Sequence, residues 1–348
     1  MDETTDIVFE RCGHAGIITL NRPKALNAVT HAMVRALAAQ LDAWDRDAAV
    51  TRVILRAAGE RAFSAGGDIR ALYELGTAGR YDEALAFWRD EYILNAAIRN
   101  YRKPYVSLID GIVMGGGVGI SVNGAFRVAG DRFQFAMPEV GIGFFPDVGG
   151  TFILPRMPGE LGTWCGLTGD RIKAADAMAS HIATHRVASA QFAELTEALS
   201  GSAPVEAVLS AFVVRPEPQQ LPRGAIDRLF IGTRVEDVLA ALDAAAQGGE
   251  DAEFAHATAA NIRTKSPTSL KVALAQIRHG KAWSFAQCMR AEFRIVSRIV
   301  EGHDFYEGVR AVIVDKDNAP RWRPEALAAV SDAEVERHFA PVAKELPL

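Results

Sequence analysis

The sequence predicts an α/β protein. Short apolar, β-rich runs alternate with helical patterns up to about residue 190, and glycine-rich loops follow several of these runs. Beyond that point the chain is rich in alanine, glutamate and leucine. Strands that alternate with helices are typical of the α/β class, and the later composition favours helices.

Length and composition agree with a folded chain of this class. The 348 residues are 49% hydrophobic and 23% charged, as in average globular proteins. Single α/β domains of about 200 to 250 residues are common. We therefore expect an α/β core over residues 1–200, followed by a mostly helical region over residues 201–348.

The first elements are a strand, a helix and a second strand. Residues 16–20 form a β-rich run that ends at the turn Asn21-Arg22-Pro23, and residues 52–56 form another. Between them, Asn27 is a plausible helix cap, because apolar residues recur after it at spacings of three and four. These apolar residues are Val29, Met33, Leu37, Leu41 and Trp44.

The order strand, loop, helix then repeats. Residues 62–69 read as a strand and a glycine-rich loop before a helical pattern over 70–75, and residues 81–101 are helical in pattern up to Lys103-Pro104. We expect further strands at 105–109, 126–129 and 133–136, with glycine-rich loops at 111–119 and 138–150.

Several classes of partner and site are disfavoured. A net charge of −5 gives no basic face for nucleic acid. Cys12, Cys165 and Cys288 lie far apart without a C-x-x-C pair, which favours a reducing, cytoplasmic location without disulfides or zinc. Neither a targeting peptide nor a membrane-spanning run is expected. His181 and His185 lack the glutamate of a zincin motif, so we expect no metal site.

Two glycine-rich loops are candidates for holding negative charge. The loops Ser64–Asp68 and Met114–Gly119 each follow a strand and precede a helical pattern. Backbone N–H groups at such positions can stabilise an anion, and glycine lets a ligand approach closely. Tight turns and close helix packing explain either loop alone equally well.

A third loop carries two carboxylates. Glu139 and Asp147 stand among apolar residues and glycines, so both side chains are expected to be partly removed from water. Such a carboxylate has a raised pKa and can serve as a base or a nucleophile. For either acid alone, a solvent-accessible cap of a loop or helix is the alternative.

These residues resemble a known family. The chain is similar to the crotonase (enoyl-CoA hydratase/isomerase) superfamily, in particular to its 3-hydroxyisobutyryl-CoA hydrolase branch. The matching strings are Asn21-Arg22-Pro23-Lys24-Ala25-Leu26-Asn27-Ala28, Phe63-Ser64-Ala65-Gly66-Gly67-Asp68-Ile69, Met114-Gly115-Gly116-Gly117-Val118-Gly119, Pro138-Glu139 and Phe145-Pro146-Asp147-Val148-Gly149-Gly150. In the C-terminal half they are Ser266-Pro267-Thr268-Ser269-Leu270, 302–311 and Asp315-Lys316-Asp317. The resemblance implies a crotonase spiral of repeated ββα units, a helical C-terminal region and frequent trimer-based assembly.

The resemblance also implies site residues. The amides of Gly67 and Gly116 match the oxyanion hole, which polarises the thioester carbonyl. Hydratases of the superfamily carry one glutamate where this chain has Gly119 and a second that matches Glu139. Because only Glu139 is present, the resemblance implies hydrolysis, with Glu139 as general base or as nucleophile through a mixed anhydride. Asp147 would bind a 3-hydroxyl group, and Glu91 would border the acyl pocket or else face solvent in a salt bridge.

Coenzyme A would enter as part of the substrate, with no separate cofactor. The resemblance places it near Lys24, Ala25, Ala65 and Gly67. The expected function is hydrolysis of 3-hydroxyisobutyryl-CoA, or a similar short 3-hydroxyacyl-CoA, in valine breakdown. Two alternatives are an enoyl-CoA hydratase or isomerase that acts through Glu139 alone, and a non-catalytic acyl-CoA-binding protein. We expect a homo-oligomer and no nucleic-acid or membrane partner.

Overall fold

The computed structural model describes residues 5–348 and divides the chain into two compact units. Unit 1 consists of residues 1–68, 90–136 and 171–220, and unit 2 of residues 69–89, 137–170 and 221–348. Each unit is thus assembled from three separate segments. The predicted boundary at residue 200 divides the chain into two continuous regions, whereas these units are discontinuous in sequence. That boundary stays a prediction.

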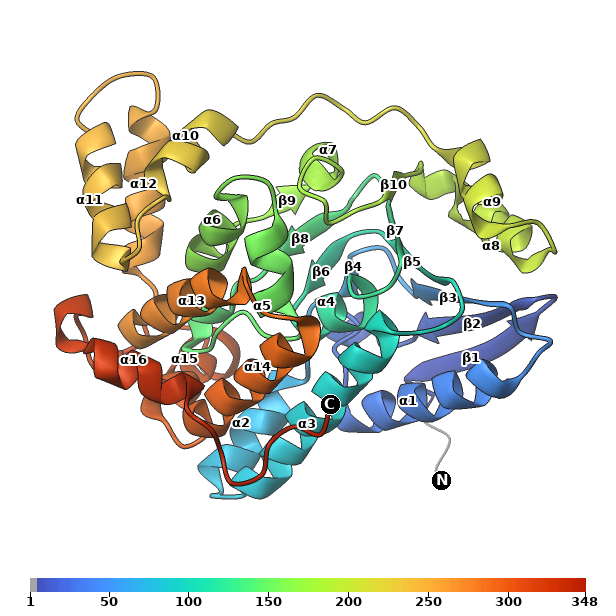
Figure 1. Cartoon of the computed structure of the whole chain (residues 1–348), viewed down its shortest axis with the longest axis horizontal. Coiled ribbons are helices and arrows are strands. Elements are labelled where there is room, and N and C mark those ends of the chain that lie inside the picture. The colour runs from blue at the N-terminus through green and yellow to red at the C-terminus, as the bar shows by residue number, and fades with distance from the viewer. Residues whose placement is uncertain (1–4) are drawn as a thin grey trace. The chain divides into compact units, whose positions relative to one another are not determined.

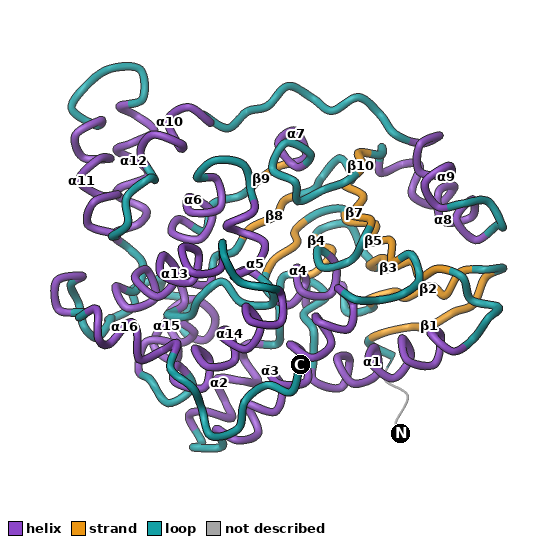
Figure 2. Tube along the Cα trace, in the orientation of Figure 1, coloured by secondary structure: helices purple, strands orange, loops and turns teal. Residues whose placement is uncertain are grey.

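Unit 1 contains both sheets of the described chain, which are drawn in orange in Figure 2. The six-stranded sheet has the order β1-β2-β3-β5-β7-β10, and all its neighbours are parallel except β1 and β2. The four-stranded sheet has the order β4-β6-β8-β9. The strands are β1 (Ile7–Cys12), β2 (Ala15–Leu20), β3 (Arg52–Ala57), β4 (Ala62–Ser64), β5 (Tyr105–Ile109), β6 (Ile112–Met114), β7 (Phe126–Ala129), β8 (Gln134–Ala136), β9 (Ile172–Lys173) and β10 (His185–Arg186).

Three helices of unit 1, α1, α8 and α9, pack on its six-stranded sheet. Side chains alternate between the two faces of a strand, so Gly16 faces Trp44 of α1 while Ile17 joins the core formed with α8 and α9. Figure 1 shows α1 running along β1 and β2. The helical segments of this unit are η1 (Pro23–Ala25), α1 (His31–Arg46), α4 (Gly116–Ser121), α7 (Ala174–Ala177), η4 (Ser189–Gln191), α8 (Phe192–Ser200) and α9 (Val205–Phe212).

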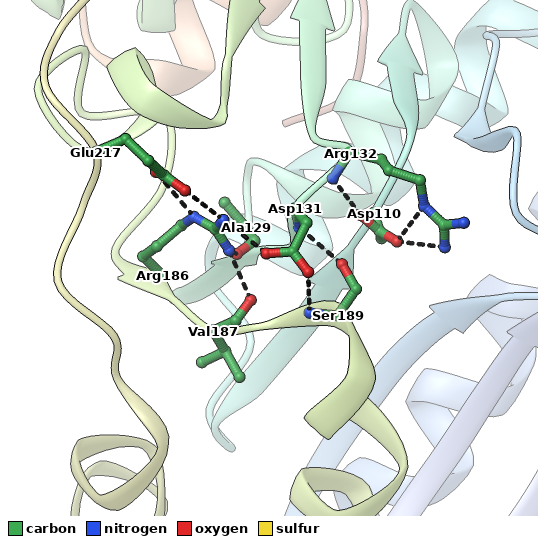
Figure 3. A network of polar contacts seen from close by, with 8 residues as sticks. All are labelled: Asp110, Ala129, Asp131, Arg132, Arg186, Val187, Ser189 and Glu217. Atoms are coloured by element: carbon green, nitrogen blue, oxygen red, sulfur yellow. Dashed lines mark hydrogen bonds and ion pairs between the residues drawn. The ribbon is translucent and has the colours of Figure 1, made fainter.

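A buried arginine secures the outer edge of this sheet. Arg186 of β10 is 3% exposed and forms ion pairs with Asp131 at 2.7 Å and Glu217 at 2.8 Å. It also donates to the backbone carbonyls of Ala129 and Val187 (Figure 3). A buried guanidinium is tolerated when its donors are satisfied in this way. The network therefore ties the extended segment around Glu217 to the ends of β7 and β10.

Unit 2 is helical in the described residues. Ser266 caps α13 and Ser284 caps α14 with a complete capping box, so serine hydroxyls fix the starts of the two main helices. The segments are α2 (Ile69–Thr77), η2 (Glu139–Ile142), α5 (Gly150–Ile153), η3 (Leu154–Arg156), α6 (Leu161–Thr168), α10 (Arg223–Leu229), α11 (Val235–Ala245), α12 (Ala252–Arg263), α13 (Pro267–Gly280), α14 (Phe285–Ile299), α15 (His303–Val309), η5 (Arg310–Val314), η6 (Leu327–Ala329) and α16 (Asp332–Phe339). Helix α3 (Tyr81–Arg99) belongs to unit 2 up to Arg89 and to unit 1 from Asp90.

The expected α/β class with a helical C-terminal region is confirmed, but the predicted cap of the first helix is wrong. The cap of α1 is Thr30, whose side chain accepts a hydrogen bond from the Met33 amide. Asn27 is instead fully buried, and its amide group donates to the carbonyls of Ala58 and Ala62. None of the helices within residues 5–348 has the length and apolarity that crossing a bilayer requires.

Candidate functional site

In unit 1, the two predicted glycine-rich segments lie side by side. The second is not the predicted loop, because β6 ends at Met114 and α4 begins at Gly116. A Cβ placed on Gly117 would lie 2.7 Å from Cβ of Ser64, and one placed on Gly116 would lie 3.2 Å from the Gly67 nitrogen. Only glycine permits this approach. Each segment also contains a glycine with a positive φ angle, Gly66 (115°) in the first and Gly115 (45°) in the second. Glycine enters this region without strain. Because β4 and β6 are parallel neighbours, Gly67 and Gly116, which follow their C-terminal ends, come together at one edge of the sheet.

The amides of Gly67 and Gly116 are available donors. Neither amide donates a hydrogen bond to any acceptor within residues 5–348. Gly116 is the first residue of α4, where an N–H group has no partner inside the helix. Two adjacent amides without acceptors can bind one oxygen atom that carries negative charge.

Glu91 of α3 lies beside this pair. Its side chain is 2% exposed, and its Oε1 lies 2.6 Å from the position of a Cβ built on Gly116. The predicted alternative of a solvent-facing salt bridge is therefore wrong for Glu91. The neighbouring Asp90 has that role, since it binds His31 at 2.7 Å and Arg35 at 2.9 Å.

The residues predicted to contact coenzyme A lie next to the first glycine loop. The amide of Ala65 donates to the carbonyl of Leu26 at 2.9 Å, which places the 3-10 turn containing Lys24 and Ala25 against the loop. Lys24 and Ala25 are exposed, and Ala65 and Gly67 are partly exposed. Exposed backbone in this position can contact a ligand.

In unit 2, Glu139 and Asp147 are both buried acids. Their exposed fractions are 6% and 4%, and Oε2 of Glu139 has no hydrogen-bond partner in the described residues. Burial raises the pKa of Glu139 well above its ordinary value, and the charges of Asp147 and Glu292 add to this effect. The structure thus groups these two acids, as the sequence predicts for the loop that carries them.

Two C-terminal motifs support the backbone at Glu139. The Ser266 amide donates to the carbonyl of Val140, and the Ser266 hydroxyl donates to Asp304 at 2.6 Å. A Cβ on Gly308 would lie 2.3 Å from the carbonyl carbon of Ile142, so α15 packs directly on η2. The segments around Ser266 and over residues 302–311 therefore contact the backbone of η2, the short helix that begins at Glu139.

Sequence reasoning missed Glu292 of α14. It is fully buried, and its carboxylate accepts hydrogen bonds from the amides of Gly149 and Thr151, both at 2.9 Å. Burial raises the pKa of Glu292 to about 8, although the two amides lower it. Glu292 occupies the same helix face as Cys288 and Ile295. A charged residue within that apolar stripe was the available signal.

No group of three or more potential metal-ligating side chains forms within residues 5–348. His181 precedes β10 and His185 lies in it, so their spacing is not helical. The thiols of Cys12, Cys165 and Cys288 are free.

The chain matches known proteins over almost its whole length. A family model described as enoyl-CoA hydratase/isomerase matches residues 15–339. A 3-hydroxyisobutyryl-CoA hydrolase, mitochondrial, of Danio rerio is 45% identical, with 97% of this chain and 90% of the relative covered. The protein of the same name from Homo sapiens is 41% identical, covering 97% of this chain and 89% of the relative.

Two solved structures also share the fold. One is described as a carnitinyl-CoA dehydratase from Mycobacterium thermoresistibile, with 44% identity, a TM-score of 0.92 and 99% of each chain covered. The other is described as an enoyl-CoA hydratase from Rhodobacter sphaeroides, with 37% identity and a TM-score of 0.90 over 99% of this chain and 100% of that one.

Proposed function

Since this chain belongs to the enoyl-CoA hydratase/isomerase family, we propose that it is an acyl-CoA thioester hydrolase that acts on 3-hydroxyisobutyryl-CoA in valine catabolism. The observation that carries this proposal is the identity of 41–45% over nearly the full chain with relatives named for that hydrolysis. The pair of amides in unit 1 and the buried acids in unit 2, each considered by itself, support the same chemistry.

In this proposal the amides of Gly67 and Gly116 bind the thioester oxygen. Attack on the carbonyl carbon moves negative charge onto that oxygen, and two preorganised donors stabilise it. Removing one such donor costs about 2.7–4 kcal/mol in other enzymes. Neither amide has an acceptor in the part of the chain that the structure describes, which supports their assignment.

Glu139 starts the reaction in one of two ways. As a general base, it takes a proton from water while the resulting hydroxide attacks the carbonyl carbon. As a nucleophile, its oxygen forms a mixed anhydride that water then hydrolyses. In both routes the C–S bond breaks, the CoA thiolate leaves and takes a proton, and the free acid is released. An acid quench during turnover separates the routes, because only the anhydride adds the acyl mass to the protein.

Asp147 contributes substrate selection. Its carboxylate accepts a hydrogen bond from the 3-hydroxyl of the acyl group, and the burial of Asp147 makes that bond strong in comparison with one in water. A 3-hydroxypropionyl group offers the same hydroxyl, so this thioester is a second expected substrate.

Coenzyme A is part of the substrate, and the proposal needs no separate cofactor. Lys24, Ala25, Ala65 and Gly67 contact the CoA portion, mainly through backbone groups. A trimer-based homo-oligomer and a cytoplasmic location complete the proposal, with no nucleic-acid or membrane partner. The relatives are named mitochondrial, so a cytoplasmic location stays a prediction of the sequence alone.

Hydration of a double bond is the second candidate function. Two structural neighbours are named as a dehydratase and a hydratase, and Glu91 supplies a further carboxylate beside Gly116. Against this candidate, Gly119 offers no side chain at the position of the first hydratase glutamate. A third candidate is binding of acyl-CoA without catalysis.

One comparison of substrates separates the three candidates. Purified protein is given 3-hydroxyisobutyryl-CoA or crotonyl-CoA while free thiol and the conjugated double bond are followed. Thiol release from the hydroxyacyl thioester is expected. Loss of the double bond without thiol release would support the hydratase, and tight binding with neither reaction would support the binding protein.

A further inference from the structure

The turn that carries Asp147 has an unusual backbone. Val148 adopts a φ angle of 51°, in the left-handed region that β-branched residues rarely enter, and Gly149 follows with a φ of 99°. Such a conformation persists when the surrounding structure fixes it from several sides. The residues that fix this turn therefore determine where the Asp147 carboxylate lies.

Two buried polar side chains hold the turn from neighbouring helices. The carboxylate of Glu292 accepts from the amides of Gly149 and Thr151, with one oxygen for each amide. Gln276 of α13 donates from its side-chain amide to the carbonyl of Pro146. These bonds flank Asp147 on both sides along the chain. Both side chains are fully buried, so no water competes for the bonds.

We propose that Glu292 is the positioning residue for Asp147, holding its turn through the Gly149 and Thr151 amides so that the enzyme selects 3-hydroxyacyl thioesters. This inference rests on the proposed function of Asp147 as the group that binds the 3-hydroxyl. Glu292 itself touches neither substrate nor reacting atoms in this account. Its role is transmitted through the backbone.

The chemistry of the two amides explains why a glutamate stands here. Both amides are donors, and an ionised carboxylate offers two acceptors. Glutamine of the same shape offers one acceptor and turns an NH2 group toward the second amide. Burial raises the pKa of Glu292 to about 8, and the titratable groups around it are Asp147, Glu139 and Cys288, with Arg156 facing Cys288. The two hydrogen bonds from Gly149 and Thr151 are therefore strongest above this pKa, where Glu292 is ionised.

The direct test is a double-mutant cycle with two substrates. Wild type, Glu292→Gln, Asp147→Ala and the double variant are assayed on 3-hydroxyisobutyryl-CoA and on isobutyryl-CoA, which lacks the hydroxyl. On the hydroxyacyl substrate, Glu292→Gln is expected to lower kcat/KM by about 10- to 100-fold, with a smaller loss on isobutyryl-CoA. Added to Asp147→Ala, it should cause little further loss.

The inference would be overturned if the loss of kcat/KM in the double variant equalled the product of the two single-variant losses. Equal losses of kcat/KM on both substrates in Glu292→Gln would also overturn it. Glu160→Gln is the matched control, because Glu160 is another partly buried acid of unit 2 that binds Thr163 and Arg278. Glu160→Gln should leave the ratio of kcat/KM for 3-hydroxyisobutyryl-CoA to kcat/KM for isobutyryl-CoA unchanged. Glu292→Asp keeps two acceptor oxygens and should recover part of the ratio.

Hydrogen exchange tests the positioning without any turnover. In Glu292→Gln, the amides of residues 147–151 should exchange faster, while α12 keeps the wild-type rate. If Glu292→Gln does not fold, Glu292→Asp undergoes the same two measurements, and an unchanged exchange rate and substrate ratio would refute the positioning role. A wild-type protein that releases no thiol from either substrate would instead refute the proposed function, while the exchange result would still test the turn.

Discussion

Oε1 of Glu91 lies 2.6 Å from the point that a Cβ on Gly116 would occupy. A Cβ at that distance would force the buried Glu91 side chain to move. The Gly67 nitrogen lies 3.2 Å from the same point and would also have to shift slightly. Glycine at position 116 therefore lets the Glu91 side chain and the Gly67 amide keep their places.

Gly116→Ala is expected to lower kcat/KM for thiol release by about 100-fold or more, because the added methyl group displaces Glu91 or the Gly67 amide, which we propose binds the thioester oxygen. Gly248→Ala is the matched control, since a Cβ there meets no atom within 4 Å. Steady-state kinetics on both variants check this prediction. Near-normal activity in Gly116→Ala would mean that the amide pair does not bind the oxygen.

Asp147→Ala should affect substrates that carry a 3-hydroxyl more than those without it. Losing a hydrogen bond to a charged group corresponds to about 1.5–3 kcal/mol, which is roughly a 10- to 150-fold lower kcat/KM. The comparison uses 3-hydroxyisobutyryl-CoA and isobutyryl-CoA. Equal losses on both substrates would remove the hydroxyl-binding role of Asp147.

The stability of the protein should depend on pH through its buried acids. The pKa of Glu139 is raised above its ordinary value, so folding favours the protonated form. Its contribution to stability is complete below the unfolded-state pKa of about 4.5 and is lost as the pH rises through the folded-state pKa. Glu292, with a pKa of about 8, acts in the same direction.

Glu139→Gln removes this titration and should therefore be stabilised relative to wild type, by an amount that grows with pH. Urea unfolding near pH 4.5 and near pH 8 measures the change in the free energy of unfolding. A difference between variant and wild type that shrinks as the pH rises would contradict the raised pKa of Glu139.

Ser266→Ala should destabilise the protein more than loss of a helix cap alone. Ser266 caps α13 and also donates to the buried carboxylate of Asp304. Ser331 caps α16 at an exposed position, and Ser331→Ala isolates the capping loss of about 1 kcal/mol. Ser266→Ala is expected to cost about 1–3 kcal/mol in addition, because Asp304 loses a buried partner. Equal losses in thermal or urea unfolding would show that the Asp304 bond adds nothing.

The sequence allowed most elements of the fold to be predicted because their periodicity is local. Strands β2, β3 and β5 contain continuous apolar runs, as expected for buried parallel strands, and α3 follows the predicted helical pattern closely. The cap of α1 was misplaced because Asn27 and Thr30 are both favourable cap residues. Only tertiary contacts with Ala58 and Ala62 decide that Asn27 is buried.

Glycines and acids that interrupt an apolar sequence pointed to the segments Ser64–Asp68 and Met114–Gly119 and to Glu139 and Asp147. The resemblance to the family then singled out Gly67 and Gly116, and the roles of all four residues stay predictions. Glu292 did not stand out, because its position within the apolar stripe of α14 indicates burial but not function. Its partners lie 143 and 141 residues away along the chain, and one sequence does not reveal contacts at such separations.

We propose that Glu139 attacks, directly or through water, a thioester whose oxygen is bound by two amides. The decisive experiment measures thiol release from 3-hydroxyisobutyryl-CoA by wild type and by Glu139→Gln, together with the affinity of each protein for the same thioester. We expect rapid release by wild type and a loss of several orders of magnitude in Glu139→Gln, with binding retained. Release by Glu139→Gln at the wild-type rate would show that Glu139 does not make the attack.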